Sequence, residues 1–431
     1  MVASENLDLP MMYAVRRNLP AGTPVDLAAA VKAEWARLGL AAQAAGRRIA
    51  IGVGSRGVAG IDVTVRALVG CVRESGGCPF IVPAMGSHGG ATAPGQIEVL
   101  GSLGVTESTV GCPIQASMEV VTLGHTPRGL PVYFDRLAAE ADGVIITNRV
   151  KEHTDFHGPT ESGLVKMLAI GLGKERGAAT LHSYGITGLR DYVPEVAAVT
   201  LNTTHLLAGF ASVEDGYHRA VHLEGFRPAE LVEGEKRLLV LARCLLPRLP
   251  VDDIDVLVVE AMGKEISGCG MDTNVIGRLR VAGEAEPERP RVGALVVLDL
   301  TEATHGNALG VGLADFTTRR LLNKIDFNLT LKNVFTSGFI DRGRIPLVYP
   351  TDEEAVAAAI DHVFRAQPER RATARVMRIH DTLTLDTLWV SASLLADVQA
   401  DSSFIAAEPV EVAWVRLSHK RGYTELSSPR T

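Results

Sequence analysis

The sequence lacks the features that mark several large classes of protein. Aromatic residues make up only 5% of its 431 residues, and no apolar run reaches the length of a transmembrane helix. The formal net charge is -7, and no basic stripe is present, which argues against nucleic-acid binding. We therefore expect a protein with no nucleic-acid partner and no membrane partner.

Cysteine is scarce as well. The sequence has five cysteines, an odd number, and no two of them form a C-x-x-C pair. This pattern makes a disulfide framework or a zinc ribbon an unsuitable interpretation. The first twenty residues lack a basic start followed by an apolar core, so we expect no secretory signal peptide and a cytoplasmic protein.

The residues that are abundant favour α/β architecture. Glycine occurs 43 times, hydrophobic residues make up 46% and charged residues 22%, as in ordinary globular proteins. Buried strands are predicted at 49–54, 79–83 and 141–148, with helices at 60–75 and 94–103 between them. This alternation is typical of parallel sheets.

The length exceeds one ordinary hydrophobic core, which predicts two domains. Two prolines and three acids between 245 and 255 place the boundary there, giving domains 1–249 and 250–431. We predict two α/β domains with mainly parallel sheets and an active-site cleft between them. The second domain is expected to have helices near 314–324, 352–365 and 389–400. Its tail, 405–431, contains a strand-like segment that is expected to pack back onto either domain.

Three polar loops follow the predicted strands of the first domain. They contain SRG (55–57), GSHGG (86–90) and RVKEHTDFHG (149–158). Ligands of parallel α/β sheets bind at the carboxyl ends of the strands, so these loops predict a site. Arg56 can grip a phosphate or carboxylate, and His88 lies in a glycine-rich loop that a ligand can approach closely. A simple turn is an equally good explanation for the second loop.

Lys166 stands in a run of small and apolar residues, in the stretch ESGLVKMLAIGLGKERG (161–177). Burial would disfavour its charged form and make its amine a nucleophile. On spacing alone, a lysine that reaches solvent from the edge of a core helix is the more common explanation. His182 follows sixteen residues later, and a lone histidine in such a place is most often an ordinary surface residue.

Two histidines share the third loop. His153 and His157 are four residues apart, a spacing that can chelate a metal on a helix. Gly158 and Pro159 follow directly, however, and favour a loop. One of the two histidines is expected to be structural.

In their order along the chain, these elements resemble the nickel-pincer nucleotide-dependent lactate racemase family. The chain shares an arginine loop (Ser55-Arg56), a G-[ST]-H loop (86–88), a histidine loop with His153, and a glycine-flanked lysine helix (162–166), followed by a histidine. In the family, the cofactor-bearing lysine and the nickel-ligand histidine are separated by the same number of residues as Lys166 and His182.

The resemblance implies a cofactor and its ligands. Lys166 would carry a pyridinium-3,5-bisthiocarboxylate mononucleotide through a thioamide bond, and nickel would be bound by this group and by His182. The cofactor would also contact Gly54, Ser55 and Ser87. Enzymes that make the cofactor are then expected as partners, and protein made without them would have an unmodified lysine.

The resemblance also implies the reaction, racemisation or epimerisation of a 2-hydroxy acid by hydride transfer to and from the cofactor. His88 and His153 would move the hydroxyl proton as general acid and base on opposite faces of the substrate. Arg56 would hold the substrate's carboxylate or carbonyl oxygen.

Several departures from the family pattern affect these assignments. The histidine-to-lysine spacing differs, so His157 is an alternative to His153 as the second acid/base residue, and Val53 replaces an aspartate of the first loop. In the second domain, Arg278 stands where the family has a substrate-binding lysine, and Lys264 and Asn274 are expected to line the site. A long surface hairpin is an equal interpretation of that segment. The substrate therefore need not be lactate.

Two other functions fit the same residues. Lys166 can form a Schiff base, which would make the chain a lyase or aldolase acting on a keto acid. The chain can also be a non-catalytic protein that binds a nucleotide or a metal. The sequence identifies neither the hydroxy acid nor the oligomeric state.

Overall fold

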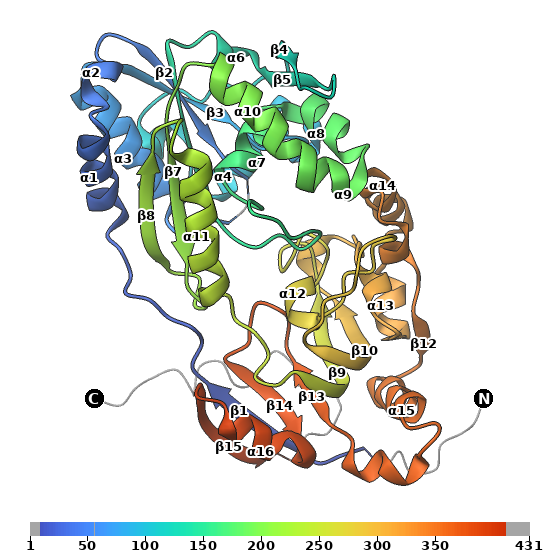
Figure 1. The fold of residues 1–431 in the computed structure, drawn as a ribbon. Coiled ribbons are helices and arrows are strands. Elements are labelled where there is room, and N and C mark those ends of the chain that lie inside the picture. Colours follow the sequence, from blue (N-terminus) through green and yellow to red (C-terminus); the bar gives the residue numbers. More distant parts are fainter. Residues whose placement is uncertain (1–8, 56, 411–431) are drawn as a thin grey trace. The chain divides into compact units, whose positions relative to one another are not determined.

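The computed structural model describes residues 9–55 and 57–410, and the chain divides into two compact units (Figure 1). The N-terminal unit runs from Pro20 to Leu246. The C-terminal unit is made of two parts of the chain, the segment that ends at Leu19 and the residues from Pro247 onward.

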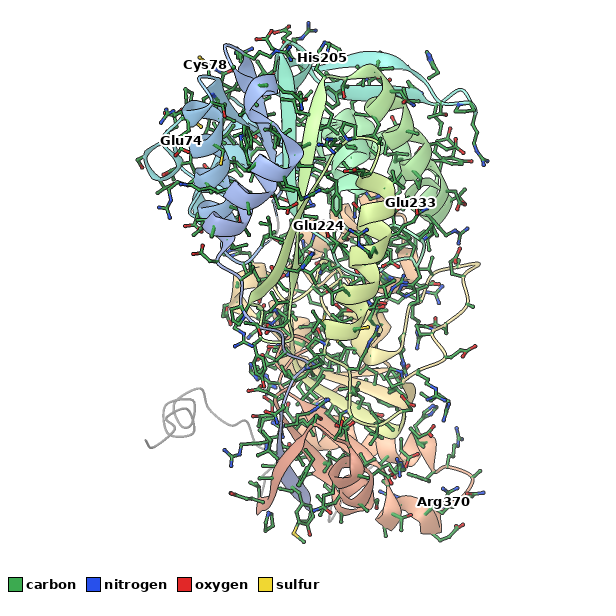
Figure 2. All side chains as sticks on the ribbon, turned by 60° about the vertical axis from the view of Figure 1, so that its left-hand side comes forward. Glu74, Cys78, His205, Glu224, Glu233 and Arg370 are labelled. Atoms are coloured by element: carbon green, nitrogen blue, oxygen red, sulfur yellow. The ribbon has the colours of Figure 1, made fainter. Side chains whose placement is uncertain are left out.

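A five-stranded sheet with the order β3-β2-β6-β7-β8 forms the centre of the N-terminal unit. Its strands are β2 (Arg48–Val53), β3 (Cys78–Pro83), β6 (Gly143–Arg149), β7 (Leu206–Glu214) and β8 (Ala220–Phe226). The first four strands in the sheet order are parallel, and β8 is antiparallel to β7. Cys78 begins β3 and His205 directly precedes β7, and both lie at the amino-terminal end of this sheet in Figure 2.

Helices cover both faces of this sheet. On one face, α1 (Leu27–Leu38) and α3 (Ile61–Glu74) pack their apolar stripes against the strands. In α3 the stripe consists of Ile61, Val65, Leu68 and Val72, whose three- and four-residue spacing puts them on one side of the helix. On the other face, Gly209 of β7 lies against the side chains of Leu164 and Leu231.

Those two leucines belong to α7 (Leu164–Lys166) and α11 (Leu231–Leu245), which therefore form the second helical layer. A hairpin of β4 (Val120–His125) and β5 (Pro131–Asp135) makes a separate two-stranded sheet. The other helices of the unit are α2 (Ala41–Ala44), α4 (Ala93–Ser102), α5 (Glu107–Val110), α6 (Arg136–Ala139), α8 (Lys174–His182), α9 (Gly185–Thr187) and α10 (Val193–Thr203).

The C-terminal unit contains an eight-stranded sheet with the order β12-β11-β10-β9-β13-β14-β1-β15. Neighbouring strands from β12 to β13 are parallel, and the pairs from β13 to β15 are antiparallel. Two apolar cores line it, one around Leu257 and Leu295 and the other around Val256 and Val296, as expected for a strand whose side chains alternate between the faces.

The elements of this unit have the following bounds. The strands are β1 (Met12–Arg17), β9 (Asp253–Met262), β10 (Arg291–Leu300), β11 (Phe316–Thr318), β12 (Leu347–Tyr349), β13 (Val376–Ile379), β14 (Thr387–Ser391) and β15 (Phe404–Val410). The helices are α12 (Thr273–Ile276), α13 (Arg319–Lys324), α14 (Phe327–Ser337), α15 (Asp352–Val363) and α16 (Ala392–Ala400).

The unit to which strand β1 belongs differs from the domain division predicted at 249/250. It pairs with β14 on one side and with β15 on the other, and it therefore belongs with the C-terminal unit although it begins the described chain. The tail expected at 405–431 includes most of β15, which pairs with β1, and its remaining residues lie outside the described part.

The structure confirms the expected α/β class with mainly parallel sheets, whereas the cleft between the domains stays a prediction. Two of the expected helices are shorter than predicted. Strand β11 occupies 316–318 of the helix expected at 314–324, and strand β14 occupies 389–391 of the helix expected at 389–400. In both places a serine or threonine at the strand end, Thr318 or Ser391, precedes the helix. Among the residues described, no helix is both long enough and apolar enough to cross a membrane.

Candidate active site

The three polar loops of the N-terminal unit leave the same edge of its sheet. Val53 at the end of β2 is paired in register with Pro83 of β3 and with Thr147 of β6, so these three parallel strands end together. The first two loops meet directly, because the Ser55 hydroxyl is hydrogen-bonded to Nδ1 of His88. The predicted cofactor residues Gly54 and Ser87 flank this contact in the sequence.

Hydrogen bonds to the backbone of Gly86 hold the loop that contains His88. The Gly86 N–H donates to the Gly171 carbonyl at 3.1 Å, and Gly86 has a φ of +58, a conformation that glycine adopts easily. The side chain of Gln96, on α4, donates to the Gly86 carbonyl at 2.9 Å. The position of His88 is therefore fixed by elements on either side of its loop.

A buried lysine lies behind this loop. Lys174 Nζ contacts the Pro83 carbonyl at 2.5 Å, the Gln96 side-chain oxygen at 3.2 Å and Asp135 Oδ2 at 3.0 Å. Both Lys174 and Asp135 have fully buried side chains. Burial lowers the pKa of Lys174 and raises that of Asp135, and the attraction between them opposes both shifts. The sequence drew no attention to Lys174, because GKERG reads as an ordinary charged surface segment.

We predict that Lys174→Met lowers the free energy of unfolding by about 3–5 kcal/mol, because it leaves the Asp135 carboxyl buried without its cation. Denaturant unfolding of the variant and the wild type measures this difference. Lys236→Met is the control, since Lys236 forms an ion pair with the exposed Glu233, and its cost should stay within about 0.5 kcal/mol. Equal costs in the two variants would contradict the role of the buried pair.

The segment with Lys166 is an interrupted helix. One turn of α-helix, Leu164–Lys166, passes into a π-helix at Met167–Gly171, and α8 starts at Lys174, which has a φ of 54. The helix expected around Lys166 is therefore not a continuous α-helix. Gly163 adopts an extended backbone conformation and delays the helix start, and π-helical turns are frequent at functional sites.

The amine of Lys166 points at a histidine. Its Nζ lies 2.5 Å from Nε2 of His153, a hydrogen-bonding distance. A hydrogen bond between two nitrogens needs a lone pair on one of them, so the amine and the imidazole are not both in their charged forms. Lys166 is thus placed against an acid/base group, in contrast to a lysine that only reaches for solvent.

The ring of His153 is fixed on two other sides. The backbone N–H of Asp155 donates to its Nδ1 at 3.0 Å, and the ring of Phe156 stacks on it with centroids 4.5 Å apart. His157 is placed differently, because its Nδ1 lies 3.3 Å from Glu161 Oε1 and its side chain is 46% exposed. This hydrogen bond raises the pKa of His157. Of the two histidines, His153 is the one that contacts Lys166.

His182, the last residue of α8, is influenced by the same group of residues. Burial lowers its pKa to about 4, the positive charge of Lys166 adds to this shift, and Asp155 opposes it. The imidazole of His182 is therefore neutral at pH 7, with a lone pair suited to a metal ion. Asp155 was missed by the sequence analysis, although its place between the two loop histidines was a signal for it.

A second carboxyl group lies under the lysine helix. Glu235 of α11 is fully buried, and its Oε2 accepts the Val165 N–H at 2.8 Å. Burial raises its pKa from 4.5 to about 7, against the effect of hydrogen bonds from the N–H groups of Val165 and Leu164. The sequence did not indicate this residue, because it lies 70 residues from Val165 in the chain.

This shift predicts a pH-dependent stability. Between pH 4.5 and 7 the folded protein binds a proton at Glu235 that the unfolded chain releases, so the free energy of unfolding falls as the pH rises through this range. Relative to Glu235→Gln, which does not titrate, the wild type should lose up to about 3 kcal/mol between pH 5 and pH 8. Urea unfolding of both proteins at the two pH values measures this change. A difference that is constant with pH would contradict it.

The candidates of the C-terminal unit lie at opposite ends of its parallel strands. Lys264 follows the carboxyl end of β9 and donates to the Asn333 side chain at 2.8 Å. Arg278 contacts the Val292 and Gly293 carbonyls near the start of β10, and it forms an ion pair with Asp315 at 2.5 Å. The structure therefore does not bring Lys264 and Arg278 together.

Asn274 is buried in the short helix α12, so its segment is a packed turn and helix, not the surface hairpin considered as an alternative. The predicted substrate residue Arg56 lies outside the described residues. Within 9–55 and 57–410, no three His, Cys, Asp or Glu side chains come together as a metal site.

Residues 59–188, which include His88, His153, Lys166 and His182, match the model of the lactate racemase N-terminal domain. This part of the chain is lactate racemase-like.

The chain as a whole is also similar to a solved structure along most of its length. This structure is the lactate racemase apoprotein from Thermoanaerobacterium thermosaccharolyticum, with a TM-score of 0.55 and 13% sequence identity. The similarity covers 86% of this chain and 94% of the other, and at this identity it supports the fold alone. No curated protein sequence matches the chain.

Proposed function

We propose that the chain is a racemase or epimerase of a 2-hydroxy acid, and that the reaction proceeds by hydride transfer to and from a nickel-pincer nucleotide attached to Lys166. The observation that carries this proposal is the 2.5 Å contact between the Lys166 amine and the His153 ring, in a domain similar to that of lactate racemases. An amine for attachment and an imidazole for proton transfer lie at one point.

The residues at the site fit such a group. His182 is neutral at pH 7, because burial and the nearby Lys166 lower its pKa to about 4, so its ring nitrogen can bind nickel. Among the described residues, His182 belongs to no group of three His, Cys, Asp or Glu side chains that could hold a metal. The other donors to nickel would therefore have to come from an organic group. Lys166 would hold that group and His182 would bind the metal. When bound, the group would supply an acceptor for the substrate's hydride.

The histidines of the loops would move the proton. The hydroxyl proton of a 2-hydroxy acid does not leave unaided at pH 7, so a base is needed. The Asp155 N–H donates to Nδ1 of His153, so Nε2 is the nitrogen that faces Lys166. Nε2 would take the hydroxyl proton in the tautomer that has its proton on Nδ1, and the Asp155 N–H contact would open in that tautomer. Attachment of the nucleotide to Lys166 would use up the free amine. Nε2 of His153 would then face the substrate in place of that amine.

His88 would serve the other isomer. It lies in a different loop from His153, and Ser55 is hydrogen-bonded to its Nδ1 and so orients the ring. Two acid/base groups on separate loops are what a racemase needs, because the planar keto acid must be approached from either face. The substrate contact assigned to Arg56, and those of the C-terminal unit, stay predictions.

The test is peptide-mass analysis and a nickel assay on protein produced together with the cofactor-making enzymes. The expected result is a pyridinium-nucleotide adduct on the peptide with Lys166 and one nickel per chain. The same protein should racemise a 2-hydroxy acid in deuterated water with little deuterium at the α-carbon, because the hydride is returned.

Two outcomes would overturn the proposal. Full deuterium incorporation would indicate a racemase that abstracts the α-proton. An unmodified Lys166 that borohydride traps in the presence of a keto acid would indicate a Schiff-base lyase or aldolase.

A further inference from the structure

Helix α11 carries two charged side chains that reach the site segments. The helix packs along β7, next to the turn of α7 (Figure 1). Its charged residues Glu233 and Arg237 are exposed. Glu235, in contrast, is fully buried, and Arg243 contacts the loop with His153. Neither inward residue belongs to the acid/base pair of Lys166 and His153.

Glu235 caps the helix that carries Lys166. Its carboxylate accepts the Val165 N–H at 2.8 Å and also interacts with the Leu164 N–H, the first two amides of α7. Helix-start amides have no partner within their own helix, so a side-chain oxygen that accepts from them supplies the missing hydrogen bonds. The preceding residue is Gly163, where a Cβ would lie 2.5 Å from the carboxyl carbon of Glu235, so a side chain at 163 would displace the cap.

Arg243 holds the loop with His153 through another carboxylate. Its Nη2 donates to Glu161 Oε1 at 2.6 Å and to the Gly158 carbonyl at 3.1 Å. Glu161, whose side chain is fully buried, accepts the His153 N–H at 2.5 Å and the Gly158 N–H at 3.1 Å. Arg243 and Glu161 thus fix the backbone of this loop at His153 and at Gly158.

We propose that α11 is the positioning element of the site: Glu235 fixes Lys166 and Arg243, acting through Glu161, fixes His153, so that one rigid helix sets the distance between amine and imidazole. The two contacts of α11 lie eight residues apart, or about 12 Å along the helix axis. The inference rests on the proposed function only in taking Lys166 as the attachment residue.

The test measures the chemistry of Lys166 in protein made without the cofactor enzymes. Trace acetylation with acetic anhydride is followed over a range of pH, and peptide masses give the rate at Lys166 relative to Lys236, a partly exposed lysine of α11. In the wild type the two pH profiles should differ, because the hydrogen bond to His153 requires that the amine or the ring be uncharged. The assay needs neither cofactor nor racemase activity.

Variants of α11 then separate positioning from general stability. In Glu235→Ala and in Arg243→Met, the Lys166 profile should move onto that of Lys236, and its relative rate at neutral pH should change about tenfold. Glu235→Gln keeps an acceptor oxygen for the Val165 N–H and should preserve the wild-type profile. The matched controls are Glu233→Ala and Arg237→Met, whose side chains are exposed on the same helix, and they should also preserve it (Glu233 and the Arg237 partner Glu224 are labelled in Figure 2).

An unchanged Lys166 profile in folded Glu235→Ala and Arg243→Met would overturn the proposal. If Glu235→Ala has no cooperative thermal transition, Gly163→Ala tests the same contact from the other side, because its methyl group would displace the carboxylate. The double variant Gly163→Ala with Glu235→Gln should then show no rescue, since the glutamine is as large as the glutamate. Absence of a pyridinium adduct in the cofactor experiment would refute the proposed function and leave this labelling result as it stands.

Discussion

Lys166→Arg should abolish both cofactor attachment and racemisation. The thioamide bond needs a primary amine, which a guanidinium does not provide, although the positive charge and much of the length are kept. We expect the rate to fall by at least about 10³-fold, to the level without enzyme. The measurements are optical rotation of a single hydroxy-acid isomer over time and the mass of the peptide that contains residue 166.

The control for this substitution is Lys236→Met, which removes a partly exposed lysine of the same unit and should leave both readouts unchanged. The folded state of Lys166→Arg is checked by its thermal transition. Racemisation within tenfold of the wild type, with no adduct on any peptide, would show that the reaction does not depend on attachment at Lys166.

The second large effect is expected at His153 and distinguishes it from His157. His153→Gln removes the imidazole that contacts Lys166, and the rate of at least one direction of racemisation should fall by about 10²–10⁴-fold, the usual contribution of a general acid or base. His157→Gln should change the rate by less than about tenfold, because this residue binds Glu161 and is half exposed. Initial rates from each isomer, measured separately, give both comparisons.

The two histidine variants serve as controls for each other, because both residues lie in one loop and both changes are to glutamine. Adduct formation on Lys166 should be kept in His157→Gln. Equal losses in the two variants would mean that the loop as a whole, not the His153 ring, limits the reaction. A larger loss in His157→Gln would make His157 the acid/base residue.

The sequence was sufficient to predict the framework of the N-terminal unit and the loops that carry the site. Apolar runs such as 49–54 and 79–83 are short and bounded by glycine or proline, which is why the strands and the polar loops after them could be located. The spacing of Lys166 and His182 is a property of the chain itself, so the sequence alone allows it to be compared with the pattern of a family.

The supporting contacts could not be predicted in this way. Asp135, Lys174 and Glu235 look like ordinary surface charges in the sequence, and only the packing of distant segments buries them. The position of β1 in the C-terminal unit likewise depends on pairing with strands more than 350 residues away, for example Met12 with Ser391. Local patterns carry no information on such long-range pairing.

The buried contacts of Lys174 have a consequence for the order in which the chain folds. They join a carbonyl at Pro83, an amide at Gln96 and a carboxyl at Asp135, which come from three segments of the chain. Until all of these segments are in place, moving the lysine out of water would leave a charge with too few partners. The group of contacts around Lys174 is therefore expected to form late in folding and in one step. A partly formed set of these contacts is then not a populated state of the folding chain.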